Sequence, residues 1–217
     1  MAKKRVAVLI SGRGSNMTAL IEAAKDRSYS AEIVLVLSNR PDAMGLARAQ
    51  AEGIPTAVID HRAHGTDRAA FEHALQATLD EHRVELVCLA GFMRLLTPDF
   101  VLPWQGRMLN IHPSLLPLFP GLDPHGRALR AGVKITGATV HFVVPETDAG
   151  PILAQAAVPV CDNDSEQTLA DRVLAVEHRV YPLALDLVAA GRVRIVGRRC
   201  LIDGARPGAS ALIVPEI

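Results

Sequence analysis

The side chains best suited to catalysis lie in the segment Asn110-Ile111-His112-Pro113-Ser114. Asn110 and His112 are two residues apart, so on a strand their side chains point to the same face. An amide donor beside an imidazole can stabilise an oxyanion that develops on a carbonyl carbon. The segment therefore predicts a catalytic site at the end of a strand.

A carboxylate that could serve this site is Asp148, in the turn-rich stretch 143–151. It would favour the protonated form of His112 and accept a proton through water. The spacing does not by itself bring Asp148 to His112. Each of these residue types also has an ordinary structural role, as a turn Asn, a capping Asp or a packed His. The pattern alone does not decide whether Asn110, His112 and Asp148 form one catalytic site.

A second signal is the glycine-rich turn Ser11–Asn16, which follows an apolar run. A turn that opens a helix offers free N–H groups, so phosphate is a natural ligand, although glycines also occur in plain turns that need a positive φ. Met17 stands where a dinucleotide fingerprint needs its third glycine, and residues 37–40 carry no acid for a ribose diol. No Gly-Lys-Ser/Thr follows, which excludes a Walker A loop. A monophosphate or pentose phosphate fits better.

The first half of the chain alternates strand and helix patterns, which predicts a doubly wound, mostly parallel twisted α/β sheet. The predicted strands cover residues 5–10, 32–37, 55–59 and 86–90, and the predicted helices cover 17–25, 43–52 and 67–82. Gly53 fits the position just after the second helix.

Beyond Pro103 the patterns change, and they predict an antiparallel extension of the sheet. The predicted elements are strands at 108–112, 138–144, 152–160 and 192–196, helices at 125–131 and 164–190, and a proline-punctuated loop at 113–121. Asp164 and Gln167 predict a capping box for the long helix, which Pro182 should kink. Its predicted apolar stripe contains Leu169, Val173, Val176, Val180, Leu183 and Leu187. We expect one domain over 1–217, with lobes at about 1–103 and 104–217.

Composition restricts the partners. Of the 217 residues 49% are hydrophobic, which allows a full core, and 23 Lys and Arg balance 23 Asp and Glu. This balance gives no case for nucleic acid or an anionic membrane. Three cysteines do not suggest a disulfide framework, and Cys88 lies in a core-like run. No apolar stretch approaches ~20 residues, and the apolar run after the basic start is too short for a signal peptide. We expect a cytoplasmic protein.

The Asn110-x-His112-Pro-Ser-Leu-Leu-Pro motif, with Asp148 in Asp-x-Gly-Pro-Ile, resembles the folate-dependent formyltransferase family. The branch of the family that acts on glycinamide ribonucleotide is similar over about residues 5 to 190. The further matching segments are 11–16, 38–39, 90–96, 120–121, 137–142 and 177–182. The resemblance implies the formyltransferase fold and transfer of a formyl group from 10-formyltetrahydrofolate to the substrate's primary amine, in purine biosynthesis and without a metal.

The resemblance also implies roles for individual residues. The catalytic trio would be Asn110, His112 and Asp148. The ribonucleotide would contact Gly12, Arg13, Gly14, Ser15, Asn16, Arg68 and Glu177. The folate would contact Met93, Arg94, Leu95, Leu96, Val101, Thr139, His141, Val143 and Val144, together with Asn110 and Asp148. The alternative for Arg68 is a solvated charge on a helix, and the alternative for His141 is a strand residue packed against its neighbours. Leu118 and Asp123 depart from the pattern of the family.

Three alternative functions remain. A formyltetrahydrofolate deformylase would use water as the acceptor, but it normally carries a preceding domain, for which the first strand at Arg5 leaves no room. A methionyl-tRNA formyltransferase would need a further nucleic-acid-binding domain. A non-catalytic folate or nucleotide-binding module would make the trio accidental. His61 and His64 read as a loop without a third metal ligand. We expect a monomer or a homodimer.

Overall fold

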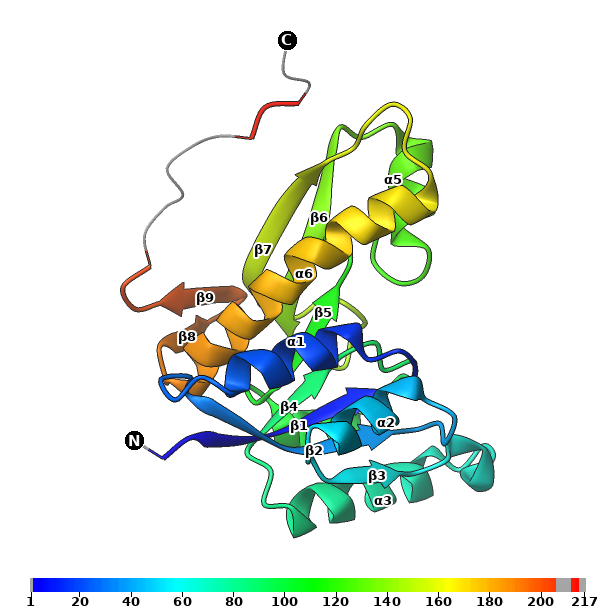
Figure 1. Cartoon of the computed structure of the whole chain (residues 1–217), viewed down its shortest axis with the longest axis vertical. Helices are drawn as coiled ribbons and strands as arrows, with labels where there is room; N and C mark the ends of the chain where they lie inside the picture. Colours follow the sequence, from blue (N-terminus) through cyan, green and yellow to red (C-terminus); the bar gives the residue numbers. More distant parts are fainter. Residues whose placement is uncertain (1, 206–211, 215–217) are drawn as a thin grey trace.

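The structure is a computed structural model that describes residues 2–205 and 212–214. Within these residues nine strands form one sheet in the order β3-β2-β1-β4-β5-β6-β7-β9-β8 (Figure 1). The first five strands in this order, from β3 to β5, are all parallel to their neighbours. Their bounds are Thr56–Val58 (β3), Ala31–Ser38 (β2), Lys4–Ile10 (β1), Leu86–Leu89 (β4) and Met108–His112 (β5). The predicted mostly parallel sheet is confirmed.

Two apolar clusters lie on the two faces of this sheet. Val6, Val8 and Ile10 of β1 belong to one cluster, whereas Ala7 and Leu9 belong to the other. This alternation is what a central strand covered on both sides requires. The first cluster contains side chains of α1 (Ser15–Ala24), α2 (Met44–Ala51) and α6 (Glu166–Ala189). The second contains side chains of α3 (Arg68–Glu81) and of the short helices α4 (Pro98–Val101) and η2 (Leu102–Trp104).

The second half of the chain adds the antiparallel part. β6 (Ile135–Phe142) pairs antiparallel with both β5 and β7 (Ile152–Pro159), as predicted. The helix α5 (Pro124–Ala131) precedes β6, and α6 lies across the face of β6 and β7 and against α1 (Figure 1). A hairpin of β8 (Val193–Val196) and β9 (Arg199–Ile202) forms the edge of the sheet next to β7. The strand β9 was not predicted.

Three local predictions were wrong. The residue that caps α6 is Ser165, whose side chain accepts from the Thr168 N–H, because Asp164 is instead bound to Arg172 at 2.6 Å. Leu183 is 56% exposed, so the apolar stripe of α6 does not include it. The stretch from His61 to His64 forms a short 3-10 helix, η1, rather than a loop.

None of the helices among the described residues combines the length and the apolar composition of a membrane span.

Candidate functional site

The centre of the candidate site is the pair of strands β5 and β6, where the sheet changes from parallel to antiparallel. Asn110 lies opposite His141, and His112 lies opposite Thr139. Ile111 points into the cluster beneath α6, so Asn110 and His112 point to the other face, as their spacing predicted. Cross-strand neighbours share a face, so four polar side chains gather at the carboxyl end of β5.

Asp148 reaches this group from the loop between β6 and β7. Its Oδ2 lies 3.4 Å from His112 Nδ1, and its Oδ1 lies 3.7 Å from His141 Nε2. The backbone N–H of Gly121 donates to Oδ2 at 2.8 Å. Asp148 has a φ of 53°, a left-handed conformation that Asp and Asn adopt more readily than most residues. The structure therefore brings together the three residues of the predicted catalytic trio.

Close backbone packing sets the path of this loop. A Cβ on Gly150 would lie 1.7 Å from the carbonyl oxygen of Phe142, so no other residue fits there without a shift of the backbone. Phe142 is the last residue of β6, one position after His141. The loop is consequently pressed onto the strand that carries His141, and Asp148 is held above it.

His112 faces an acceptor at each ring nitrogen. Its Nδ1 faces Asp148, and its Nε2 lies 2.9 Å from the carbonyl oxygen of Phe119. The side chain is only 8% exposed. With acceptors on both sides, the protonated ring can donate two hydrogen bonds, and an oxyanion could accept from Nε2 by replacing the carbonyl of Phe119.

Asp148 is a buried carboxylate that its neighbours keep ionised. Burial alone would raise its pKa, but the adjacent His141 imidazole, the hydrogen bond from the Gly121 N–H and the nearby His112 together lower the pKa below its ordinary value. Asn110 Nδ2 also lies 3.2 Å from His141 Nε2. One imidazole therefore touches both the amide and the carboxylate of the trio.

A hydrogen-bond network fixes the loop that follows β5. Thr139 Oγ1 donates to the carbonyl of Ser114 at 2.7 Å and accepts from the N–H of Leu116 at 3.0 Å. Gln155 Nε2 on β7 donates to Thr139 Oγ1 and to the carbonyl of Leu116. Thr139 is fully buried, so its role in the structure is to hold this loop against β6. Sequence reasoning did not identify Gln155.

The glycine-rich turn lies at the carboxyl end of β1, on the same edge of the sheet as the end of β5. Gly14 has a φ of 69° and caps α1 without a side-chain hydrogen bond. The N–H of Gly45 donates to the carbonyl of Gly12 at 3.0 Å. A Cβ on Gly14 would lie 3.1 Å from the Cα of Gly45, so the turn packs directly against the start of α2.

A buried polar pair lies behind this turn. Asn16 Nδ2 donates to Glu177 Oε2 at 2.7 Å, and Glu177 is only 6% exposed. Burial raises the pKa of Glu177, although the hydrogen bond from Asn16 opposes this. Asn16 Oδ1 is buried and has no hydrogen-bond partner among the residues that the structure describes. A polar ligand at the turn would satisfy this atom.

The remaining predicted contact residues lie around the same edge. Ser11 Oγ donates to Asn39 Oδ1 at 2.5 Å and accepts from the N–H of Met93 at 2.7 Å, which connects the turn to the segment after β4. Arg68 lies at the start of α3, and its Nη2 donates to the carbonyl of Leu95 at 2.5 Å. The exposed residues are Arg13, Arg68, Met93 and Leu95, the partly buried ones are Ser15, Arg94, Leu96, Val143 and Val144, and Val101 is buried.

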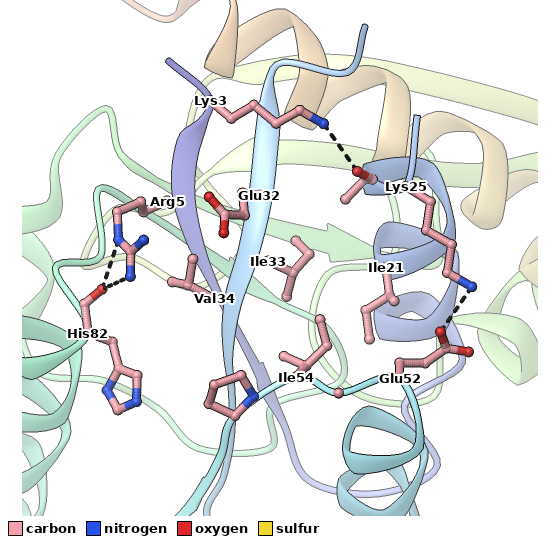
Figure 2. Close-up of a pocket in the computed structure, with 13 residues that line it drawn as sticks. Lys3, Arg5, Ile21, Lys25, Glu32, Ile33, Val34, Glu52, Ile54 and His82 are labelled. Carbon is pink, nitrogen blue, oxygen red and sulfur yellow. Dashed lines mark hydrogen bonds and ion pairs between the residues drawn. The ribbon is translucent and has the colours of Figure 1, made fainter. Parts of the chain in front are cut away.

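Two hollows lie on the surface of the protein. Figure 2 shows one of about 470 Å³ at the opposite end of the sheet, beside the start of β1. Its cationic side chains are already engaged: Lys3 donates to the carbonyl of Ala24, Arg5 to that of His82, and Lys25 pairs with Glu52. The other, of about 430 Å³, is lined by residues that include Gln105, Val143, Val144 and Arg198. Only the second adjoins the predicted folate residues.

Within the described ranges no three His, Cys, Asp or Glu side chains gather in an arrangement that could hold a metal ion.

Comparison with known proteins places this geometry in a family. A model of the formyl transferase family matches residues 4–185. The chain belongs to the formyl transferase family. Phosphoribosylglycinamide formyltransferase of Escherichia coli (strain K12) is 44% identical over 201 residues, which cover 93% of this chain and 94% of that protein. The formyltransferase fold was therefore predicted correctly.

Other relatives differ in length or in activity. The trifunctional purine biosynthetic protein adenosine-3 of Gallus gallus is 52% identical over 91% of this chain, which spans about a fifth of the length of that protein (20%). The structure of glycinamide ribonucleotide transformylase 1 from Symbiobacterium toebii superposes with a TM-score of 0.89 at 46% identity, covering 92% of this chain and 94% of the other. A formyltetrahydrofolate deformylase from Pseudomonas syringae has a TM-score of 0.84 but only 28% identity, covering 92% of this chain and 66% of that one.

Proposed function

We propose that the protein transfers the formyl group of 10-formyltetrahydrofolate to the primary amine of glycinamide ribonucleotide, a step of purine biosynthesis. The observation that carries the proposal is the convergence of Asn110, His112 and Asp148 at the carboxyl end of β5, on the edge of the sheet that also holds the glycine-rich turn. The names of the similar proteins of matching length support the same activity.

In the proposed reaction the amine nitrogen attacks the formyl carbon, and the carbonyl oxygen becomes an oxyanion. Asn110 Nδ2 would donate a hydrogen bond to this oxyanion, and the protonated His112 would do so through Nε2 once the oxyanion replaces the carbonyl of Phe119. The C–N bond to the folate then breaks, and the proton lost by the amine ends on the folate nitrogen. Asp148, kept ionised by its neighbours, would stabilise the imidazolium and pass this proton on through water.

The ribonucleotide would bind with its phosphate at the turn Gly12–Asn16. Gly14 and Ser15 begin α1, where free N–H groups and the helix dipole favour an anion. Arg13 and Arg68 are exposed cations that would add charge to this site. Glu177, with one carboxylate oxygen bound to Asn16, would accept a hydrogen bond from the ribose.

The folate would lie between the 91–97 stretch and the loop that carries Asp148. Met93 and Leu95, each 69% exposed, offer apolar surface to a flat ring, and Arg94 could pair with a glutamate carboxylate. Leu96, Val101, Thr139, His141, Val143 and Val144 would form or support the walls of this site. We also propose that the enzyme works in the cytoplasm, because its three cysteines are free thiols, which a reducing compartment favours. Its oligomeric state is proposed to be a monomer or a homodimer.

The test is a spectroscopic assay of tetrahydrofolate formation with and without glycinamide ribonucleotide. Transfer predicts formation that depends on the amine and stops when the amine is consumed. Formation at the same rate without the amine would instead identify a hydrolase, like the deformylase with the similar fold. No turnover under either condition would overturn the proposal and favour a binding module.

A further inference from the structure

The helix α3 presents a row of polar side chains to one segment of the chain. Arg68, Glu72 and Gln76 are spaced four residues apart, so they lie on one face of the helix. All three bond to the stretch 91–104, which we call the β4–β5 segment. Arg68 donates to the carbonyl of Leu95, and Trp104 Nε1 donates to Gln76 Oε1 at 2.9 Å.

The middle residue of this row, Glu72, is the unusual one. Its side chain is buried, with the residue only 5% exposed. Both carboxylate oxygens are used by one partner: Oε1 accepts from the N–H of Thr97 at 2.6 Å, and Oε2 accepts from Thr97 Oγ1. A carboxylate is costly to bury unless it is hydrogen-bonded. Within the described part of the chain, both side-chain hydrogen bonds of Glu72 therefore go to one residue of the β4–β5 segment.

The packing of α3 does not need this carboxylate. Phe71, Leu75 and Leu79 anchor the helix in the second apolar cluster, and each is at most 5% exposed. A methyl or methylene group at position 72 would serve such packing better than a charge. The carboxylate is better explained by what it holds than by the stability of α3.

Thr97 is the residue at which the β4–β5 segment becomes helical again. It is the N-cap of α4, and it directly follows Met93–Leu96, which have no helix or strand pairing to fix them. The N–H of Met93 is held at the other end by Ser11 Oγ. Besides the packing of Leu96 against the second apolar cluster, the shape of this stretch depends on hydrogen bonds at its two ends and on the one from Arg68 to Leu95.

We propose that Glu72 is a positioning residue for the folate: through Thr97 it fixes Met93–Leu96 in the conformation that binds the co-substrate. This inference rests on the proposed function. Glu72 touches neither substrate, so its effect should appear in folate affinity rather than in the chemical step.

The test compares variants of the full chain by steady-state kinetics and by calorimetric titration with tetrahydrofolate. In Glu72→Ala the two Thr97 donors lose their acceptor. The folate KM and the Kd for tetrahydrofolate should each rise about tenfold, because without these hydrogen bonds Met93–Leu96 can leave the conformation that binds folate. The kcat and the KM for glycinamide ribonucleotide should stay within about twofold of wild type, because neither depends on the conformation of Thr97.

Two further variants keep the test decisive if Glu72→Ala does not fold. Thr97→Val removes only the hydroxyl donor and should raise the folate KM about threefold, whereas Thr97→Ser keeps that donor and should restore the wild-type value. Thr78→Val is the matched control. It lies on the same helix, its Oγ1 donates only to the carbonyl of Ala74 within α3, and it should leave both KM values unchanged.

The proposal is overturned if the folate KM stays within twofold of wild type in Thr97→Val and in any folded Glu72→Ala. It is also overturned if both KM values rise equally, or if Thr97→Ser behaves like Thr97→Val, since either result points to a general loss of structure. A wild-type protein without transfer activity would refute the proposed function itself. Unchanged variants of an active wild type would refute only the role of Glu72.

Discussion

The substitution Asp148→Asn tests the catalytic role of the carboxylate with little change in shape. Asparagine tolerates the left-handed backbone of this position, and its side-chain oxygen can still accept from the N–H of Gly121. What it loses is the negative charge that lies 3.4 Å from His112 Nδ1 and 3.7 Å from His141 Nε2. The variant should therefore fold and bind both substrates.

The size of the effect follows from these distances. Opposite unit charges 3.4 Å apart attract by about 5 kcal/mol at an effective dielectric constant of about 20. Only the part of this attraction that grows as charge develops in the transition state affects kcat. The amide dipole of asparagine keeps some of it. We expect a loss of about 3–4 kcal/mol, which corresponds to a decrease in kcat of about 10²–10³-fold.

The assay is tetrahydrofolate formation at saturating concentrations of both substrates, with thermal unfolding measured on the same samples. Asp123→Asn is a matched control, because Asp123 also has a φ of 53° and also accepts from a glycine N–H, that of Gly126. Its side chain is 47% exposed and pairs with Arg130, so the control should keep wild-type turnover. A folded Asp148→Asn with more than a tenth of the wild-type kcat would refute the reasoning.

Two further predictions concern the ribonucleotide side of the site. Gly14→Val places a β-branched residue at a φ of 69° and against Gly45, so we expect the KM for the ribonucleotide to rise at least about tenfold more than that for folate; equal changes in both would contradict a phosphate turn. Glu177→Gln should raise the melting temperature at neutral pH. Because burial raises the pKa of Glu177 in the folded protein, its carboxyl stabilises the fold at pH values below its unfolded-state pKa of about 4.5. This contribution is lost as the pH rises through the higher pKa of the folded state. In melting curves from pH 4 to 8, the melting temperature of Glu177→Gln should exceed that of the wild type by a margin that grows with pH, and a margin that does not change with pH would contradict the burial argument. The variant should also bind the ribonucleotide more weakly.

The sequence predicts well what depends on the periodicity of one element. Alternation along residues 108–112 was enough to put Asn110 and His112 on the same face, and the apolar runs were enough to define the parallel strands. It could not place Asp148, because its position depends on the register of β6 against β5 and on the close approach of Gly150 to Phe142. Neither follows from local pattern, and here only the family resemblance supplied the link.

The cap of α6 was predicted wrongly because two neighbouring residues could each fill that position. Asp164 and Ser165 can both cap a helix, and the choice fell on Ser165 because Arg172, a full two turns away, binds Asp164. The strand β9 was missed although a signal was present: Gly197 and Arg198 form a two-residue connection between β8 and β9, typical of a hairpin. Glu72 gave no signal, since a single acid in a helix usually faces solvent.

The contact between Gly12, Gly14 and Gly45 has a consequence for selectivity. The turn that we propose to bind phosphate is held by the start of α2, so its shape is set before any ligand binds. A rigid cradle loses little conformational freedom on binding, which improves affinity for the one anion it fits. The same stiffness prevents it from widening for a diphosphate. The N–H of Gly45, which donates to the carbonyl of Gly12, should accordingly exchange slowly with solvent deuterium even without ligand.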